Sequence, residues 1–208
     1  MTKSLFVTGI GTGVGKTVGS AVLCKAFNAD YWKPIQAGDL KSSDSIFVQQ
    51  FSQTQGKIWP ERYALKYAMA PHKAAELEGV RMELSDLHLP DSNNKLIIEG
   101  AGGCAVPINE QHTYLDFIQK QNLATVLVVH NYLGSINHTL LSIEALKARN
   151  IDLKGIILIG SENQASEKAY TDHGGVQILG RIPWAKKINQ QFIAEAAAPF
   201  KELESSLF

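Results

Sequence analysis

Short apolar runs alternate with amphipathic segments along most of the chain. Five runs of strand length are rich in Val, Ile and Leu. They cover residues 4–8, 95–99, 124–130, 155–160 and 176–180. Continuous apolar stretches such as LVV and IIL predict strands that are buried on both faces, as in a parallel sheet. Helices are expected over residues 16–27, 114–121, 136–149 and 167–173. This alternation predicts a doubly wound α/β fold, with a mainly parallel sheet and helices on both faces.

Two stretches depart from this alternation. Residues 56–94 are less regular and contain three prolines, so we expect them to pack against the sheet edge or the active site. Residues 189–207 predict a C-terminal helix that is interrupted at Pro199, because proline cannot donate a helical hydrogen bond. The sequence shows no internal repeat and no linker, so residues 1–208 are expected to form a single P-loop α/β domain.

Composition excludes several classes of protein. The 20 basic and 20 acidic side chains cancel to a formal net charge of zero, which argues against a general nucleic-acid binder. No apolar run reaches about 18 residues and the N-terminus has no cationic leader, so neither a membrane span nor a signal peptide is expected. Two cysteines, Cys24 and Cys104, are too few for a disulfide framework or a zinc site. We therefore expect a soluble, cytoplasmic protein without nucleic-acid or membrane partners.

The strongest motif is GIGTGVGKT at residues 9–17, which follows a predicted strand and opens a predicted helix. This is the context of a Walker A phosphate loop. Glycines let backbone N–H groups point at phosphate oxygens, and the helix N-terminus adds the positive end of its dipole. Lys16 is expected to neutralise β- and γ-phosphate charge, and Thr17 to offer a hydroxyl to Mg²⁺. The alternative is an ordinary glycine-rich turn.

The spacing of this loop is unusual. Five residues separate Gly9 from Gly15, rather than four, because position 10 is isoleucine. ATPases that position cell-division or plasmid machinery begin a similar loop with lysine, and the matching position here is Gly11. That signature is therefore missing from this chain.

A lysine and an aspartate are expected at the same edge of the sheet, where parallel strands end. Lys33 closes a short strand and is followed by Pro34, and it is either a catalytic cation or a surface charge. Asp44 follows Ser43 at the start of an amphipathic run. Ser43 could cap this helix, which leaves Asp44 either to bind a metal or to favour the helix dipole.

A glutamate forms the second strong motif, because Glu99 ends a buried apolar run and precedes the small residues 100–103. A carboxylate in this position is costly without a partner. It suits Mg²⁺, with Thr17 and Asp44 supplying further oxygens and waters completing the octahedron. The alternative is an ion pair between Glu99 and Lys16 without a metal.

The segment GSINH at residues 134–138 follows a predicted strand and begins a helix. Free N–H groups at such a helix start suit a carboxylate. Plain capping by Ser135 is the alternative. His138 has no cysteine, carboxylate or histidine at ligand spacing, so it is interpreted as structural.

Together these segments resemble the dethiobiotin synthetase family, ATP-dependent enzymes of biotin synthesis. The matching motifs run in order along nearly the whole chain: VTGIGTGVGKT, YWKPIQAG, SDS, APHKAAELEG, EGAGG, LGSINHTLLSIEAL and LGRIPW. The resemblance implies a ligase that uses ATP and Mg²⁺ to convert 7,8-diaminononanoate and CO₂ into dethiobiotin, with release of ADP and phosphate. It further implies that a carbamate forms first, that the γ-phosphoryl group moves to the carbamate, and that the second amine closes the ring.

The resemblance also implies roles for individual residues. The expected catalytic residues are Lys16 and Lys33, beside the carbamate and γ-phosphate. The expected metal ligands are Thr17, Asp44 and Glu99. The expected ATP contacts are Gly13, Val14, Gly15, Lys16, Thr17, Val18, Asp44, Glu99, Gly100, Ala101, Gly102, Ile159, Gly160, Ile182, Pro183 and Trp184. The expected substrate contacts are Lys33, Ala37, Ser135, Ile136 and Asn137, of which the last three serve the partner subunit of a homodimer.

Three positions depart from the family pattern. Ala37 stands where Ser or Thr is common, and Tyr132 stands where Lys or Arg is frequent. Ile159 stands where an Asn reads adenine, so we expect only a weak preference for ATP over other nucleoside triphosphates. A different function remains as the alternative: a P-loop ATPase switch whose ATP-bound dimer recruits a protein or membrane partner. Gly11 and the lack of a basic amphipathic helix at the C-terminus argue against that switch.

Overall fold

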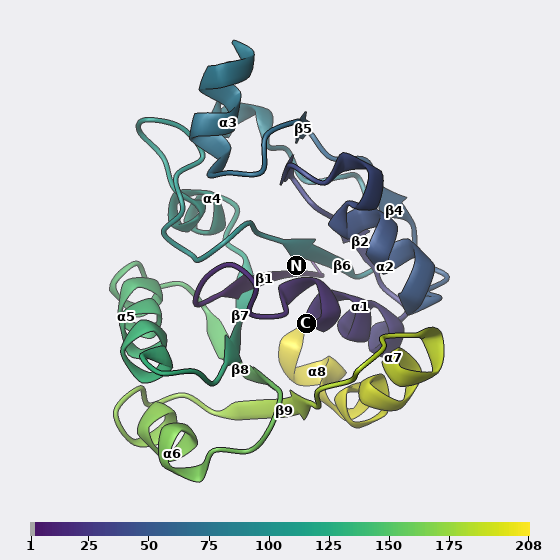
Figure 1. The fold of residues 1–208 in the computed structure, drawn as a ribbon, viewed down its shortest axis with the longest axis vertical. Helices are drawn as coiled ribbons and strands as arrows, with labels where there is room; N and C mark the ends of the chain where they lie inside the picture. Colours follow the sequence, from purple (N-terminus) through teal and green to yellow (C-terminus); the bar gives the residue numbers. More distant parts are fainter. Residues whose placement is uncertain (1–2) are drawn as a thin grey trace.

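A seven-stranded sheet forms the centre of the computed structural model, which describes residues 3–208 (Figure 1). The strand order is β4-β2-β6-β1-β7-β8-β9, and neighbouring strands run parallel. The strands are β1 (Ser4–Gly9), β2 (Asp30–Trp32), β4 (Ile58–Trp59), β6 (Leu96–Glu99), β7 (Ala124–His130), β8 (Leu153–Ile159) and β9 (Ile178–Ile182). The predicted parallel sheet is confirmed.

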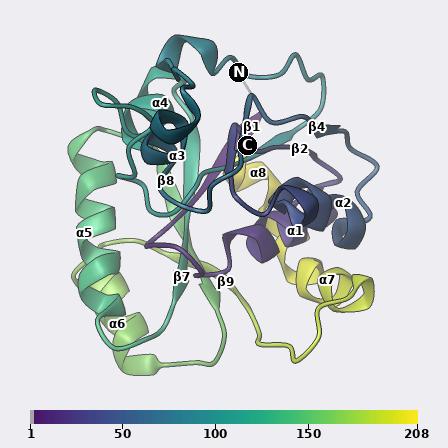
Figure 2. The same cartoon turned by 45° about the horizontal axis from the view of Figure 1, so that its top comes forward.

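Helices lie on both sides of this sheet (Figures 1 and 2). One side carries α1 (Lys16–Phe27), α2 (Asp44–Ser52), α7 (Gln190–Ala197) and α8 (Glu204–Leu207). The other side carries α3 (Pro71–Glu78), α4 (Tyr114–Lys120), α5 (Ser135–Ala148) and α6 (Gln164–Asp172). The doubly wound arrangement is therefore as predicted. No helix among residues 3–208 is both long and apolar enough to cross a membrane.

Successive residues of β1 and β6 belong to different cores. Phe6 packs in the cluster that includes Phe117 of α4, whereas the next residue, Val7, packs in the cluster that includes Leu23 of α1. Successive side chains of a strand point to opposite faces, so a strand covered on both faces must be apolar throughout. This explains the continuous apolar runs in the sequence.

Most element boundaries lie within three residues of the sequence prediction. The largest shift is at α6, which begins at Gln164 because the Asn163 side chain caps it, accepting a hydrogen bond from the Ser166 N–H at 3.0 Å. The C-terminal helix is interrupted near Pro199 as predicted, where the segment Ala198–Leu203 forms a 3₁₀ helix. Capping by Ser43 is also confirmed, since its hydroxyl accepts the Ile46 N–H at 3.4 Å.

The irregular residues 56–94 contact both the sheet edge and the cleft described below, as expected. Strand β4 is held on the edge by Asp30, whose carboxylate accepts the Lys57 N–H at 2.8 Å and the Trp59 ring N–H at 2.9 Å. The segment also contains β5 (Tyr63–Leu65), which pairs with β3 (Ile35–Ala37) in a second, two-stranded parallel sheet. That sheet could not be predicted, because three-residue strands are too short to show a periodicity.

Candidate active site

A cleft of about 700 Å³ lies at the carboxyl ends of β1, β2 and β6. It gathers most of the residues that the phosphate-loop and carboxylate motifs predicted. Those lining it are Gly13, Gly15, Lys16, Thr17, Val18, Lys33, Ala37, Asp44, Glu99, Ala101 and Gly102. Parallel strands end at one edge of the sheet, and this topology brings segments that are far apart in the sequence into one site.

The phosphate loop connects β1 directly to α1, as the motif predicts. Gly13 and Gly15 have φ angles of 73° and 93°, in the left-handed region that favours glycine. The Lys16 ammonium reaches back across the loop and donates to the Gly11 carbonyl oxygen at 2.8 Å. Burial lowers the pKa of Lys16 to about 8, although the nearby Glu99 carboxylate opposes this shift. The loop thus presents a cation and the free N–H groups of a helix start to the same space.

Three oxygen atoms from three elements meet at the first turn of α1. The Thr17 hydroxyl oxygen lies 2.8 Å from Asp44 Oδ1 and 2.9 Å from Glu99 Oε1. A hydroxyl has one proton and cannot donate to both carboxylates at once, so this oxygen set is suited to a cation. Mg²⁺ prefers such oxygens, with one or two carboxylates beside phosphates and waters. Residues 3–208 contain no cluster of three His, Cys, Asp or Glu side chains that could hold a metal, so phosphate and water would complete the shell.

Lys33 follows β2 directly and is buried between the two carboxylates. Its ammonium pairs with Asp44 and lies 3.2 Å from Glu99 Oε1 and 3.4 Å from the Gly100 carbonyl oxygen. Burial by itself lowers its pKa, but Glu99 and Asp44 outweigh burial and raise the pKa of Lys33 above its ordinary value. Glu99 therefore forms an ion pair as one sequence alternative proposed, but with Lys33 instead of Lys16.

Several residues in the cleft or behind its wall were missed by the sequence analysis. The Tyr31 hydroxyl donates to Glu99 Oε2 at 2.9 Å, and the Gln36 side-chain oxygen accepts the Asp44 N–H at 3.3 Å. Residues 68–71, before and at the start of α3, also line the cleft, as do Asp39, Val106 and Thr12 of the phosphate loop. In the sequence, Tyr31 cannot be distinguished from the apolar residues of a buried strand. Only the fold shows where its hydroxyl points.

Comparisons with known proteins agree with this geometry. The model of a family described as "AAA domain" matches residues 3–191. The chain is 46% identical over 203 residues to the ATP-dependent dethiobiotin synthetase BioD of Christiangramia forsetii, covering 97% of this chain and 98% of the relative. It is 45% identical over 197 residues to the protein of the same name in Cytophaga hutchinsonii, covering 94% and 95%. The chain belongs to the dethiobiotin synthetase family. The predicted resemblance is confirmed.

Solved structures of more distant proteins share the fold. A ParA family ATPase from Chlorobium tepidum superposes with a TM-score of 0.58 at 16% identity, covering 99% of this chain and 94% of the other. The cell-division ATPase MinD from Pyrococcus furiosus gives 0.56 at 15% identity, covering 98% and 100%. At this identity the likeness shows the fold alone. The family relationship instead favours the enzyme over the ATPase switch.

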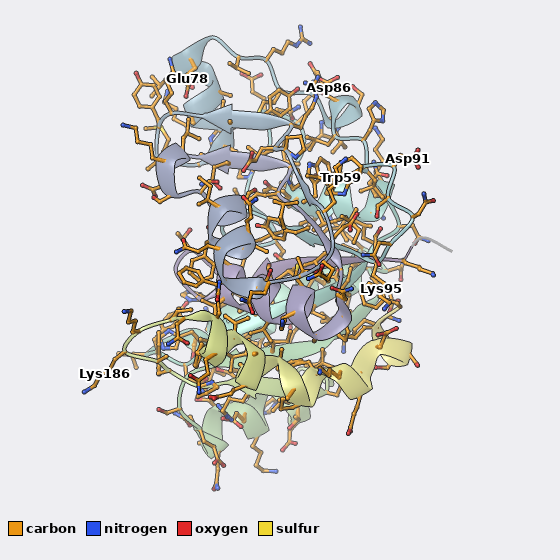
Figure 3. All side chains as sticks on the ribbon, turned by 90° about the vertical axis from the view of Figure 1, so that its right-hand side faces the viewer. Trp59, Glu78, Asp86, Asp91, Lys95 and Lys186 are labelled. Atoms are coloured by element: carbon orange, nitrogen blue, oxygen red, sulfur yellow. The ribbon has the colours of Figure 1, made fainter. Side chains whose placement is uncertain are left out.

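The dethiobiotin synthetase resemblance assigned a group of residues to the adenine base of ATP, and these residues lie outside the cleft. Ile159 is 4% exposed and packs against Gly15, while Ile182 is fully buried. The Gly160 N–H donates to the Ile182 carbonyl oxygen at 2.8 Å, so these two backbone groups satisfy one another. Trp184 is 60% exposed, and its ring meets that of His130 edge to face at 4.9 Å. Lys186 projects from the loop that follows (Figure 3). Trp184 and the exposed Pro183 therefore offer the accessible surface of this group.

The start of α5 also lies outside the cleft. Gly134 is the N-cap and Ser135 is the first helical residue, so plain capping by Ser135 is wrong. The Ser135 hydroxyl is instead buried 3.1 Å from the Tyr170 hydroxyl. Ile136 is 38% exposed and Leu133 is fully exposed, which leaves an apolar surface at this end of the helix.

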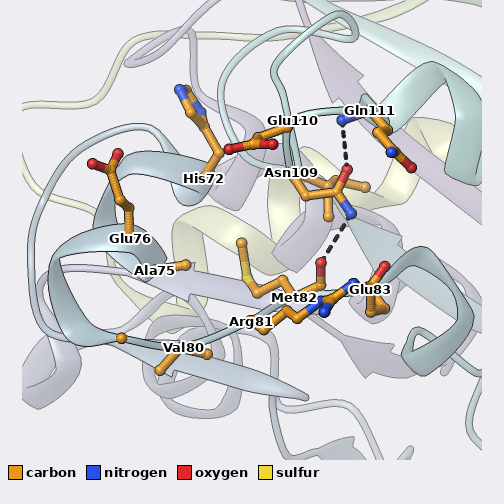
Figure 4. Close-up of a pocket in the computed structure, with 12 residues that line it drawn as sticks. His72, Ala75, Glu76, Val80, Arg81, Met82, Glu83, Asn109, Glu110 and Gln111 are labelled. Atoms are coloured by element: carbon orange, nitrogen blue, oxygen red, sulfur yellow. Dashed lines mark hydrogen bonds and ion pairs between the residues drawn. The ribbon is translucent and has the colours of Figure 1, made fainter.

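A second, smaller cleft of about 430 Å³ lies between α3 and residues 108–111 (Figure 4). Its walls include His72, Glu76 and Glu110, and Asn109 bridges it by donating to the Met82 carbonyl oxygen at 2.9 Å. None of the predicted site residues lines this cleft. The larger cleft is therefore the candidate active site.

Proposed function

We propose that this chain catalyses the ATP- and Mg²⁺-dependent conversion of 7,8-diaminononanoate and CO₂ into dethiobiotin, ADP and phosphate. The observation that carries the proposal is the convergence of two lysines and three metal-binding oxygens in one cleft of a dethiobiotin synthetase family member. Phosphoryl transfer needs little covalent help from a protein. It needs alignment and neutralised charge, which these groups provide.

The phosphate loop and the oxygens of Thr17, Asp44 and Glu99 have separate tasks in this proposal. The free N–H groups at the start of α1 and the Lys16 ammonium bind the β- and γ-phosphates. The three oxygens hold Mg²⁺, which supplies charge neutralisation at the phosphates when it is bound. Because these oxygens belong to α1, α2 and β6, the sheet fixes their positions before nucleotide binds.

Lys33 acts on the carboxylated substrate. The first amine of the diamine attacks CO₂ and loses a proton, which gives a carbamate. The carbamate oxygen then accepts the γ-phosphoryl group and ADP leaves. The second amine attacks the carbamoyl carbon, and phosphate leaves as the ring closes. The Lys33 ammonium, kept charged by Asp44 and Glu99, lies in the cleft wall where it can neutralise the carbamate.

The substrate site is completed by a second copy of the chain. The exposed residues Leu133, Ile136 and Leu141 give the start of α5 an apolar surface that suits a homodimer. Ser135, Ile136 and Asn137 of one subunit then contact the substrate carboxylate in the partner's cleft. The proposal treats residues 1–208 as one domain. It also includes a cytoplasmic location, because free thiols such as those of the buried Cys24 and Cys104 persist in a reducing compartment.

One assay separates this enzyme from the ATPase switch, whose fold it shares. Purified protein is mixed with Mg-ATP and bicarbonate, with and without 7,8-diaminononanoate, and ADP and dethiobiotin are measured. The enzyme releases ADP in step with dethiobiotin and only when the diamine is present. Slow ADP release that the diamine does not change would support the switch and refute the proposal.

Shared sites are tested by mixing two inactive variants. Lys16→Ala removes a charge of the phosphate loop, and Asn137→Ala removes the contact from the other subunit. A hybrid dimer contains one site with neither substitution, so activity should return when subunits exchange. No recovery, with exchange demonstrated by differently tagged chains, would refute a substrate site shared between subunits.

A further inference from the structure

The two oxygens of the Glu99 carboxylate have different environments. Glu99 Oε1 faces the cleft, with the Thr17 hydroxyl at 2.9 Å and the Lys33 ammonium at 3.2 Å. Glu99 Oε2 points the other way, and within residues 3–208 its one hydrogen-bond partner is the Tyr31 hydroxyl at 2.9 Å. Both Glu99 and Tyr31 are 0% exposed, so water does not compete for this contact.

The sheet places Tyr31 for this contact. Tyr31 is the central residue of β2 and pairs in register with Ile97 of β6, two residues before Glu99 on the same strand. Residues two apart on a strand share a face, so the Tyr31 side chain lies on the same face as Glu99. Tyr31 packs in the core beneath α1 together with Ile97 and Leu23. A phenol is long enough to bring a hydroxyl from this core to the carboxylate.

A glutamate carboxylate needs such a partner to keep one orientation. Its last torsion is broad and has two equivalent positions, so the staggered rotamers alone do not fix the carboxylate plane. The Tyr31 hydroxyl keeps its proton at neutral pH and can donate it to Oε2. If Oε2 is bound, Oε1 alone is free to face Thr17 and a cation. Without the hydroxyl, a buried acceptor loses its partner and the carboxylate turns to find another.

We infer that Tyr31 is a positioning residue for the metal site: its hydroxyl locks Glu99 so that Oε1 is presented to Mg²⁺ beside Thr17 and Asp44. The inference rests on the metal assignment of the proposed function. Tyr31 does not touch the cation, the nucleotide or the diamine. It acts through Glu99, as hydrogen-bond partners behind metal ligands generally do, where their loss costs about 10–100-fold in metal affinity.

Calorimetric binding of ADP at increasing Mg²⁺ concentration tests this role without any turnover. Tyr31→Phe keeps the aromatic ring and removes only the hydroxyl. We expect the Mg²⁺ concentration that gives half of the enhancement of ADP binding to rise about tenfold, in line with the loss of such a partner. ADP binding in EDTA should equal that of the wild type. Circular dichroism checks the fold, and Tyr31→Met, which fills the same core without a hydroxyl, should give the same shift.

The matched control is Tyr63→Phe. The Tyr63 hydroxyl also donates to a carboxylate, that of Asp86 at 2.6 Å, but this pair lies outside the cleft. Its removal should leave the Mg²⁺ dependence unchanged. The coupling is tested in a Glu99→Gln background, where Tyr31→Phe should shift the Mg²⁺ dependence by less than twofold, because no carboxylate remains to be positioned.

The outcomes separate the two proposals. A wild-type Mg²⁺ dependence in both Tyr31→Phe and Tyr31→Met would refute the role of Tyr31 and leave the metal site intact. A tenfold shift that persists in the Glu99→Gln background would also refute it, because Tyr31 would then act through the core. ADP binding by the wild type that does not respond to Mg²⁺ would refute the metal site itself, and the positioning role with it.

Discussion

The phosphate loop separates two regions that are built differently. On the side of β6 and β2 lie Lys33, Asp44 and Glu99, and we call these three residues the charged side. On the side of β8 and β9 lie Ile159 and Trp184, the apolar side, where the polar backbone groups of Gly160 and Ile182 bind one another. The charged side is expensive to bury, so each of its polar atoms must find a partner and its geometry is narrowly fixed.

The difference suggests where the family can change its chemistry. Replacing one buried charged residue leaves its partner of opposite charge unpaired. Substitutions on the charged side are therefore tolerated only when its residues change together. An apolar surface recognises a ligand by shape alone. Substitutions there therefore alter the preference between nucleotides without disrupting the site. The departure at position 159 lies on the apolar side. Lys33, Asp44 and Glu99 on the charged side match the residues that the family resemblance assigns.

The largest effect should come from removing a lysine of the cleft. We expect Lys16→Ala and Lys33→Ala each to lower kcat at least about 100-fold, because each ammonium neutralises charge at the phosphoryl group in transit. ATP binding should fall for Lys16→Ala and stay nearly unchanged for Lys33→Ala. The measurements are kcat for dethiobiotin formation at saturating substrates and calorimetric ATP binding.

The control for both variants is Lys25→Ala, which removes a lysine from the last turn of the same helix, α1, outside the cleft. It should keep wild-type turnover. Near wild-type kcat for Lys33→Ala at saturating diamine would show that the charged side is structural and would overturn the assignment of Lys33.

The apolar side predicts a loose choice of nucleotide. Apolar contact discriminates by roughly 10–200-fold, whereas a pocket that hydrogen-bonds its ligand reaches several powers of ten. With Ile159 nearly buried and Trp184 as the exposed surface, kcat/KM for ATP should exceed that for GTP or CTP by no more than this range. Values of kcat/KM measured with the diamine saturating check the expectation. A preference for ATP above about 1,000-fold would mean that polar groups read the base.

The apolar side meets the phosphate loop at Gly15, and a pair of glycine substitutions measures that contact. A Cβ at Gly15 would lie 3.0 Å from Ile159 Cγ1, whereas a Cβ at Gly13 would meet no atom within 4 Å. Both residues have positive φ, so both alanine variants carry backbone strain of about 1–2 kcal/mol. Gly15→Ala should therefore lower the free energy of unfolding more than Gly13→Ala does. Equal losses in urea unfolding would show that Ile159 gives way freely.

Much of this architecture could be predicted from the sequence. The remaining features could not be predicted, for physical reasons. Long apolar strands and the loop at residues 9–17 carry strong local signals, so the sheet and the phosphate site were recognisable. Glu99 was recognisable because a carboxylate after a buried run has few other uses. The ion pairs of Lys33 and the hydroxyl of Tyr31 depend on which strands are neighbours. Strand order is a property of the fold and leaves no periodicity in the sequence.

The smallest expected effect concerns an ion pair near the surface. It tests whether burial, rather than charge itself, makes the loss of a charged residue costly on the charged side. Asp116 pairs with Arg149 at 2.5 Å and accepts the Thr113 N–H at 2.6 Å, but it lies near the surface at the start of α4. Burial is the largest single influence and opposes its charge, but the Thr113 and Arg149 hydrogen bonds together outweigh it and lower the pKa of Asp116 to about 2 from an ordinary 3.8. Because the folded pKa is depressed, the stabilisation is fully present well above pH 3.8 and is lost progressively as the pH falls through about 2.

Asp116→Asn should accordingly lower the free energy of unfolding at pH 7 by only about 1 kcal/mol, the range of exposed ion pairs and helix caps. The difference between variant and wild type should shrink with added salt, which screens exposed charges, and should fall steadily as the pH is lowered toward 2. The matched control is Asp152→Asn, which removes an aspartate whose pair with Lys154 is more exposed and should change stability by less. Urea unfolding between pH 2 and 7 measures all three proteins. A loss above about 3 kcal/mol at Asp116 would equal the cost of breaking a buried pair, and burial would then no longer distinguish the charged side from the surface.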